Sequence, residues 1–102
     1  MAIHSSVSPD GSTLNITVEG RFDASYLDDF RRCYEGGASE GVKKYVVDLS
    51  DTLHLDSSAL GMLLVLRDYA GGDASDISIC NCSDDVKKIF AISAFGQLFD
   101  IQ

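Results

Sequence analysis

The spacing of apolar residues changes several times along this 102-residue chain, and those changes limit the folds that it can adopt. In "LNITV", residues 14–18, every second residue is apolar, as in a strand with one buried face. Leu27, Phe30 and Tyr34 instead recur at helical spacing. The sequence therefore predicts an α/β domain, in which helices pack against a mixed sheet.

The expected order of elements is β-β-α-β-α-β-α-β, with strands over residues 2–7, 14–18, 44–50, 76–80 and 98–101. The run 44–50 carries Tyr45, Val46, Val47 and Leu49 without alternation, which is typical of a strand covered on both faces. We expect this run to be the central strand. A helix separates it from the strand over 76–80, and this order implies a right-handed parallel crossover.

Start and stop signals bound three predicted helices. Each begins at a polar capping residue, and the first two end at paired glycines. The first starts at Asp23 or Ser25 and ends at Gly36 and Gly37, the second covers 57–70 and ends at Gly71 and Gly72, and the third starts at Ser83 and turns Val86, Ile89 and Phe90 inward.

Length and composition predict one domain over residues 1–102, because 45% apolar residues are enough for a single core. The formal charge of -8 repels nucleic acid and anionic lipid surfaces, so we expect neither as a partner. The start of the chain lacks the pattern of a signal peptide, and the longest apolar run, 62–66, is too short to span a membrane. We expect a soluble, cytoplasmic protein.

The cysteines do not predict a cofactor or a metal. Three cysteines without a secretory signal do not form a disulfide framework, and Cys33 fits a small apolar position. Cys80 and Cys82 are not followed by a second pair of ligands at zinc spacing. We therefore expect no metal site and no cofactor.

The segment "DTLHLDSS", residues 51–58, connects the expected central strand to the second helix. Function in α/β sheets is concentrated at the carboxyl ends of the strands, where this segment lies. Asp56, Ser57 or Ser58 could simply cap the helix, because these residue types dominate N-caps. A serine here could also attack a substrate or accept a group from another enzyme, and the residues of the segment leave these alternatives open.

The second helix has an unusual outward face. Ala59, Met62, Leu63, Leu66 and Ala70 share the face expected to pack on the sheet, and Ser57, Gly61, Leu64 and Asp68 lie opposite, flanked by Leu60 and Val65. Gly61 costs roughly 0.5–1 kcal/mol of stability relative to Ala inside a helix, so its small size must serve either close packing or close approach of a partner. We interpret Leu60, Gly61 and Leu64 as a candidate partner-binding surface.

The stretch Asp56, Ser57, Ser58, Ala59, Leu60 and Gly61 resembles the signature of the STAS domain family, specifically its small anti-sigma factor antagonists. Similarity extends to "VEGRFDAS", with Gly20 and Asp23 before the first helix, and to "VKKIFAISAF" in the third helix. The resemblance implies that Ser57 is phosphorylated by a serine kinase, often itself the anti-sigma factor, and that a PP2C-type serine phosphatase reverses this. It implies that Asp56, Ser58 and Asp23 support the phosphorylation site.

Two features depart from the family pattern, one residue and the end of the sequence. Ala59 stands where the family usually has Gly, and since Ala disfavours positive φ, we expect ordinary helix there. Family members commonly continue into a fourth helix after the last strand, whereas this sequence stops at Gln102. The sheet surface left uncovered would then be available to a partner or to weak homodimerisation.

Other classes of protein fit the residues less well. A hydrolase nucleophile elbow needs G-x-S-x-G, but position 55 is Leu, and His54 lies too close along the chain for a triad base. A receiver domain would use Asp48, but the accompanying acidic pair and Lys are missing. We therefore predict that the protein is not an enzyme. An acyl-carrier-like protein, or a STAS module of a larger signalling complex without sigma-factor output, remains an alternative.

Overall fold

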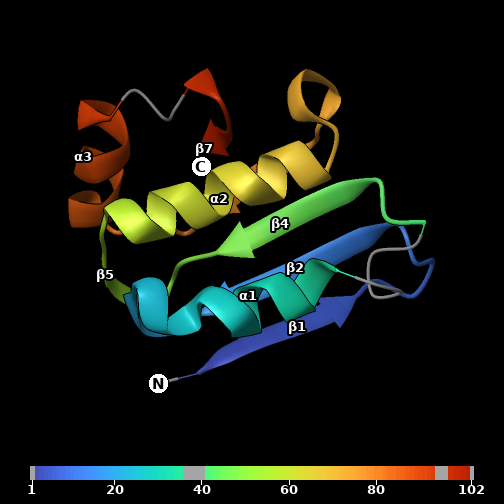
Figure 1. The fold of residues 1–102 in the computed structure, drawn as a ribbon, viewed down its shortest axis with the longest axis horizontal. Helices are drawn as coiled ribbons and strands as arrows, with labels where there is room; N and C mark the ends of the chain where they lie inside the picture. The colour runs from blue at the N-terminus through green and yellow to red at the C-terminus, as the bar shows by residue number, and fades with distance from the viewer. Residues whose placement is uncertain (1, 36–40, 94–96, 102) are drawn as a thin grey trace.

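The computed structural model describes residues 2–35, 41–93 and 97–101. Its main sheet has five strands in the order β1-β2-β4-β6-β7 (Figure 1). These strands are β1 Ile3–Val7, β2 Thr13–Val18, β4 Lys44–Asp48, β6 Ile77–Cys80 and β7 Asp100–Ile101. The pair β1 and β2 is antiparallel, and every other neighbouring pair is parallel. The α/β fold class and the central position of β4 are therefore confirmed.

A second sheet was not predicted. It consists of two short parallel strands, β3 Gly20–Phe22 and β5 Thr52–Leu55. The segment 51–58, which the sequence predicts as a plain connection, therefore contains a strand. Strands of three and four residues are too short to show a period of two, so the apolar pattern could not reveal them. Gly20 adopts φ +77°, a conformation that favours glycine, between β2 and the body of β3.

The three α-helices are α1 Leu27–Tyr34, α2 Ser57–Tyr69 and α3 Asp84–Ile92, and short 3-10 turns cover η1 Ala24–Tyr26 and η3 Gly72–Ala74. In Figure 1, α1 and α2 lie in front of the sheet and run in the same direction. The Asp23, Ser83 and Gly71 signals fall where the elements begin and end, and Ala59 is ordinary helix, as expected. The expected stop at Gly36 and Gly37 lies outside the described residues.

The expectation that the central strand is covered on both faces is wrong. Tyr45 and Val47 are buried, while Val46 and Asp48 between them are only partly buried. Val46 lies beside Asn15 of β2 and Ser78 of β6, on a mainly polar face of the sheet. The alternation of this strand is not visible in its run of apolar residues, because valine tolerates a partly exposed sheet position.

The core lies between the helices and one face of the sheet. Helix α2 buries Ala59, Met62, Leu63 and Leu66, as its helical spacing predicts, while Ala70 is only partly buried. In α3, Val86 and Phe90 are buried and Ile89 is partly buried. Leu27 does not join Phe30 and Tyr34 in the core, because it stands in the first turn of α1 and is 46% exposed. No helix among the described residues has both the length and the apolarity that crossing a bilayer requires.

Candidate functional site

The starts of η1 and α2 lie side by side because the paired strands β3 and β5 lead directly into them. Strands β3 and β5 are parallel, with Phe22 opposite Leu55, and each is followed at once by an aspartate. The N–H of Asp56 donates to the carbonyl of Phe22 at 3.4 Å, so the small sheet continues up to the start of α2. The ladder thus brings Asp23 and Asp56, which lie far apart in sequence, to the same edge of the fold.

Both aspartates act as helix N-caps. The side chain of Asp56 accepts from the N–H of Ala59 at 3.1 Å and so caps α2. Asp23 accepts from the N–H of Ser25 at 3.0 Å and from the Ser25 hydroxyl, and so caps η1, which leads into α1. Hydrogen bonds from Ser25, assisted by the charge of Arg21, lower the pKa of Asp23. The supporting roles expected of Asp23 and Asp56 are compatible with these positions.

Ser57 and Ser58 are the first two residues of α2, and both side chains are exposed. Asp56 makes the capping hydrogen bond to Ala59, so neither serine hydroxyl is needed for it. The expectation that Asp56, Ser57 or Ser58 caps the helix is met by Asp56, so capping does not account for the two serines. An exposed hydroxyl at the start of a helix is accessible to a modifying enzyme.

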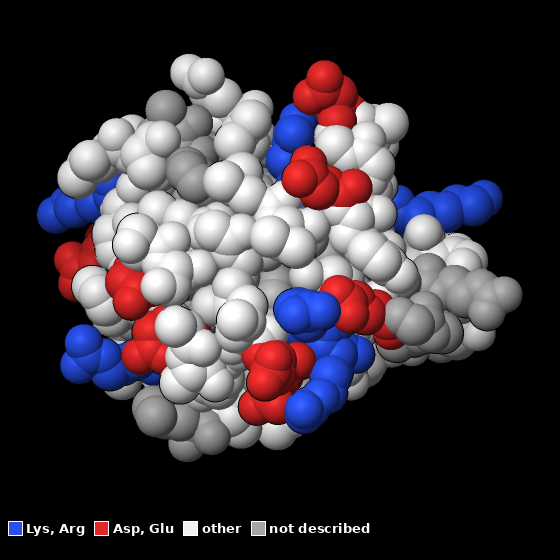
Figure 2. All heavy atoms as spheres, in the orientation of Figure 1, with Lys and Arg blue, Asp and Glu red and all other residues white. Residues whose placement is uncertain are grey.

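Along α2 the outward surface is mainly uncharged (Figure 2). Leu64 is 37% exposed, Val65 is 52% exposed, and Leu60 is partly buried against the core. Among the described residues, a Cβ added to Gly61 would meet no heavy atom within 4 Å apart from its chain neighbours and the nearby backbone of its own helix. Close packing within the molecule therefore does not explain this glycine.

A groove of about 500 Å³ separates α1 from α2. Its lining includes Leu27 and Arg31 from α1 and Ser58, Gly61 and Val65 from α2. Helical spacing groups Leu27 with Phe30 and Tyr34, and nothing in the sequence assigns Arg31 to a site. Leu27 and Arg31 lie beside Gly61 because α1 and α2 pack side by side. The residue pattern within either helix does not show that arrangement.

The arginines at this surface are already paired. Arg31 Nε lies 3.1 Å from Glu35 Oε1, and Arg67 Nη2 lies 2.8 Å from Asp73 Oδ1. Figure 2 shows charged groups over α1, towards the far end of α2 and along the left side of the view, around the uncharged surface of α2. At the start of α2, the carboxylate of Asp56 is engaged in capping, and the hydroxyl-bearing side chains of Ser57 and Ser58 are exposed.

Other candidate residues are placed elsewhere. His54 is exposed on β5 opposite Arg21. Asp48 at the end of β4 accepts from Asn81 Nδ2 at 3.2 Å. Burial raises the pKa of Cys80 and of Cys82, which disfavours thiolate ligands. Within residues 2–35, 41–93 and 97–101 no three His, Cys, Asp or Glu side chains gather as a group that could hold a metal ion.

The five-stranded mixed sheet, the paired helix starts and the capped serine motif define a STAS-type domain. The family described as "Mlab, STAS domain" matches residues 5–100, and the chain belongs to this family. It is 54% identical over 101 residues to a STAS-domain containing protein of Pseudomonas aeruginosa (strain UCBPP-PA14), and the match covers 99% of both chains.

Solved structures of anti-sigma factor antagonists share the fold. The phosphorylated form of the Bacillus cell fate determinant SpoIIAA has a TM-score of 0.74 at 19% identity, covering 99% of this chain and 91% of that chain. The unphosphorylated SpoIIAA structure has a TM-score of 0.71 at 18% identity, with 89% and 83% covered. An antagonist from Mycobacterium paratuberculosis has a TM-score of 0.78 at 15% identity, with 98% and 85% covered. At these identities the likeness establishes the fold alone. That fold contains a sheet, which argues against the all-helical acyl-carrier alternative.

Proposed function

We propose that this protein is a phosphorylation-switched binding regulator in the cytoplasm, with Ser57 as the phosphate acceptor. In its unphosphorylated form it binds and sequesters an anti-sigma factor or serine kinase, so that a sigma factor or another regulator is released. Phosphorylation of Ser57 ends this binding, and a PP2C-type phosphatase restores it. The observation that carries the proposal is that Ser57 is exposed at the first position of α2 while Asp56 caps the helix.

The start of α2 suits a phosphate for electrostatic reasons. A helix N-terminus presents unpaired N–H groups and a partial positive charge, which stabilise an anion. Phosphorylation adds roughly -1.5 to -2 charges, and it can be accommodated there without unfolding the helix. The change is therefore expected at the surface that the partner contacts, with little change in the fold.

The partner surface continues from Ser57 along the outward face of α2. Leu64 offers an exposed apolar side chain, and Gly61 leaves open space beside it. Buried apolar anchors dominate the binding free energy of such interfaces. A phosphate at the margin of the interface weakens binding, because its charge must be desolvated when the partner docks. The supporting observations favour binding rather than catalysis, because they concern an accessible surface and not a set of reacting groups.

The site of modification is tested by phosphorylating the purified protein with the cognate serine kinase and mapping the product by mass spectrometry. One phosphate is expected on Ser57. The matched variants are Ser57→Ala, which should take up none, and Ser58→Ala, which should take up as much as the wild type. Phosphate on Ser58 instead would show that the acceptor has been assigned to the wrong serine.

The binding surface is tested with Leu64→Ala and, as a control on the same helix, Tyr69→Ala, both measured for partner binding and for stability. Leu64→Ala should weaken binding at least tenfold, a loss of about 1.4 kcal/mol. Leu64 and Tyr69 are 37% and 46% exposed, so neither change should unfold the domain. Wild-type affinity in Leu64→Ala would remove Leu64 from the interface.

A further inference from the structure

The outer edge of β1 has no strand partner among the described segments. In Figure 1, β1 lies at one side of the sheet, and β2 is its one neighbour among the described strands. Ala2 accepts from the N–H of Glu19, and Ser8 donates to the carbonyl of Thr13. Hydrogen-bonding positions alternate along an antiparallel pair, so residues 2, 4, 6 and 8 direct their backbone groups towards β2. The N–H and C=O groups of Ile3, Ser5 and Val7 therefore point outward, away from the sheet.

This edge lacks the features that usually prevent strand pairing. Natural edge strands carry lysine, proline, a bulge or a covering element. The segment "IHSSV" contains no Lys, Arg, Asp, Glu or Pro, and its register with β2 is continuous. Although the whole chain carries a formal charge of -8, two copies of this strand would meet without repulsion between carboxylates on the strands themselves.

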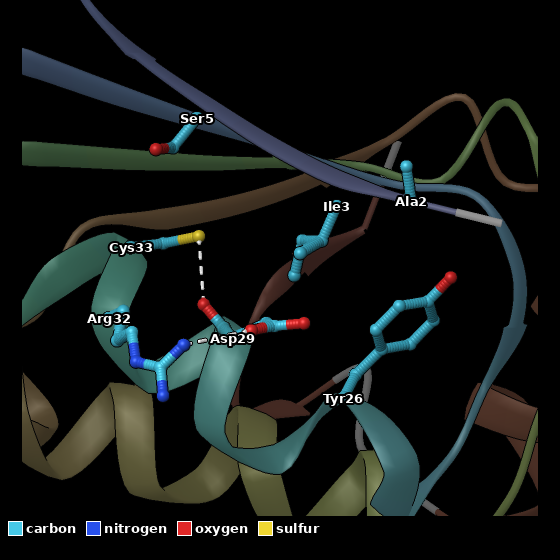
Figure 3. A pocket seen from close by; sticks show the side chains of 7 residues that line it. All are labelled: Ala2, Ile3, Ser5, Tyr26, Asp29, Arg32 and Cys33. Carbon is cyan, nitrogen blue, oxygen red and sulfur yellow. Dashed lines mark hydrogen bonds and ion pairs between the residues drawn. The ribbon is translucent and has the colours of Figure 1, made fainter.

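Beside the edge there is room for the side chains of an added strand. A cleft of about 460 Å³ lies between β1 and α1 (Figure 3). Its lining includes Ile3 and Ser5 from β1, and Asp29, Arg32 and Cys33 from α1. The Cys33 thiol donates to the carbonyl of Asp29 at 3.3 Å, and Arg32 pairs with the Asp29 carboxylate at 3.2 Å. Helix α1 thus leaves part of this face of β1 uncovered.

We propose that β1 pairs with β1 of a second copy, antiparallel about a two-fold axis that passes between the two Ser5 residues. In that register Ser5 exchanges hydrogen bonds with its counterpart, and Ile3 exchanges them with Val7 of the other copy. Ile3, Ser5 and Val7 lie on the face of the sheet that carries the helices, so the cross-strand contacts are apolar to apolar and serine to serine. Val7, now 47% exposed, becomes covered by Ile3. The strand is self-complementary, and this is why the occupant is a second copy.

The two main sheets join into one continuous sheet in this dimer, which is an isologous, closed arrangement. The start of α2 takes no part in it, so the inference goes beyond the proposed switch and stands without it. Dimerisation therefore leaves Ser57 free for the kinase and is expected to be unaffected by Ser57→Asp.

Sedimentation equilibrium of the full chain over a range of concentrations tests the pairing. The average mass of the wild type should rise towards twice that of the chain as concentration increases. Ser5→Pro removes an outward N–H, a loss that an edge strand tolerates within its own sheet. This variant should raise the dimer dissociation constant at least tenfold. Ser5→Ala keeps that N–H and should behave like the wild type.

Val7→Lys places a charge on the same edge and provides a second test should Ser5→Pro fail to fold, as judged by circular dichroism. It should also raise the dissociation constant at least tenfold. A wild type that stays monomeric up to about 1 mM, the weak end of specific association, would overturn the proposal. Dimerisation of Val7→Lys as strong as that of the wild type would overturn it too.

Discussion

The N–H of Asp56 donates to the backbone carbonyl of Phe22 across 3.4 Å, and this contact joins the start of α2 to the end of β3. The next residue after Phe22 is Asp23, the cap of η1, while Asp56 is itself the cap of α2. A single parallel ladder therefore determines where both helices begin. Asp56 fills the capping role of α2, and Ser57 and Ser58 are exposed beside it.

Asp56→Ala should destabilise the protein by about 1 kcal/mol, because the N–H of Ala59 loses its capping acceptor. Urea unfolding followed by circular dichroism measures the difference. Ser57→Ala is the matched control on the adjacent residue, and it should change the free energy of unfolding by less than about 0.5 kcal/mol, as for other surface substitutions. Equal losses in the two variants would mean that Ser57 shares the capping role.

Gly61→Ala should stabilise the protein by roughly 0.5–1 kcal/mol, because alanine is the better helix former and its Cβ enters open space. Gly61→Leu should leave the fold intact but fill the groove between α1 and α2, and so weaken partner binding. Thermal unfolding and binding titration separate the two effects. Destabilisation by Gly61→Ala would show that the glycine is required by the fold itself.

Tyr34→Phe should raise the free energy of unfolding, by about 1 kcal/mol. Tyr34 is 1% exposed, and its hydroxyl has no hydrogen-bond partner among the atoms that the structure describes. A buried hydroxyl without a partner costs about 1–3 kcal/mol, whereas the ring contacts with Phe30 and Tyr69 remain in the variant. Chemical denaturation measures the change, and a clear loss of stability would indicate that the hydroxyl is in fact satisfied.

The Asp10 carboxyl should titrate at about 2, well below its usual value of 3.8. The Ser8 hydroxyl donates to it at 2.6 Å, and the Ser12 N–H and hydroxyl donate at 3.0 and 2.8 Å. Because the folded pKa is lower than the unfolded one, the stabilisation is complete above about pH 4 and is lost as the pH falls towards 2. Carboxyl NMR should show this midpoint, and in a Ser8→Ala, Ser12→Ala double variant the midpoint should rise towards the usual value.

The sequence predicts the long elements well, because each presents its own period. The spacing of Ala59, Met62, Leu63 and Leu66 identified the buried face of α2, and the Ser83 signal identified the start of α3. The short strands β3 and β5 cannot be predicted from the sequence, because a few residues cannot display a period. The adjacency of Asp23 and Asp56 cannot be predicted either, since it depends on the pairing of those strands.

The candidate site rests on the motif and only partly on physical pattern. The outward position of Leu64 and Gly61 followed from helical spacing, and the open space beside Gly61 agrees with it. Which of Asp56, Ser57 and Ser58 caps the helix could not be decided from residue type, since all three are good caps. The groove requires Leu27 to face α2, and that depends on how two helices cross rather than on either helix alone.

Two calorimetric titrations of the kinase or anti-sigma partner under identical conditions, one with the unphosphorylated protein and one with the protein phosphorylated on Ser57, show whether phosphorylation ends binding. Ser57→Asp and the neutral Ser57→Asn separate the effect of charge from that of size. Phosphorylation should weaken binding at least tenfold, or about 1.4 kcal/mol, Ser57→Asp should have the same effect, and Ser57→Asn should bind more tightly than Ser57→Asp. Equal affinity of the phosphorylated and unphosphorylated proteins would show that phosphorylation of Ser57 is not the switch.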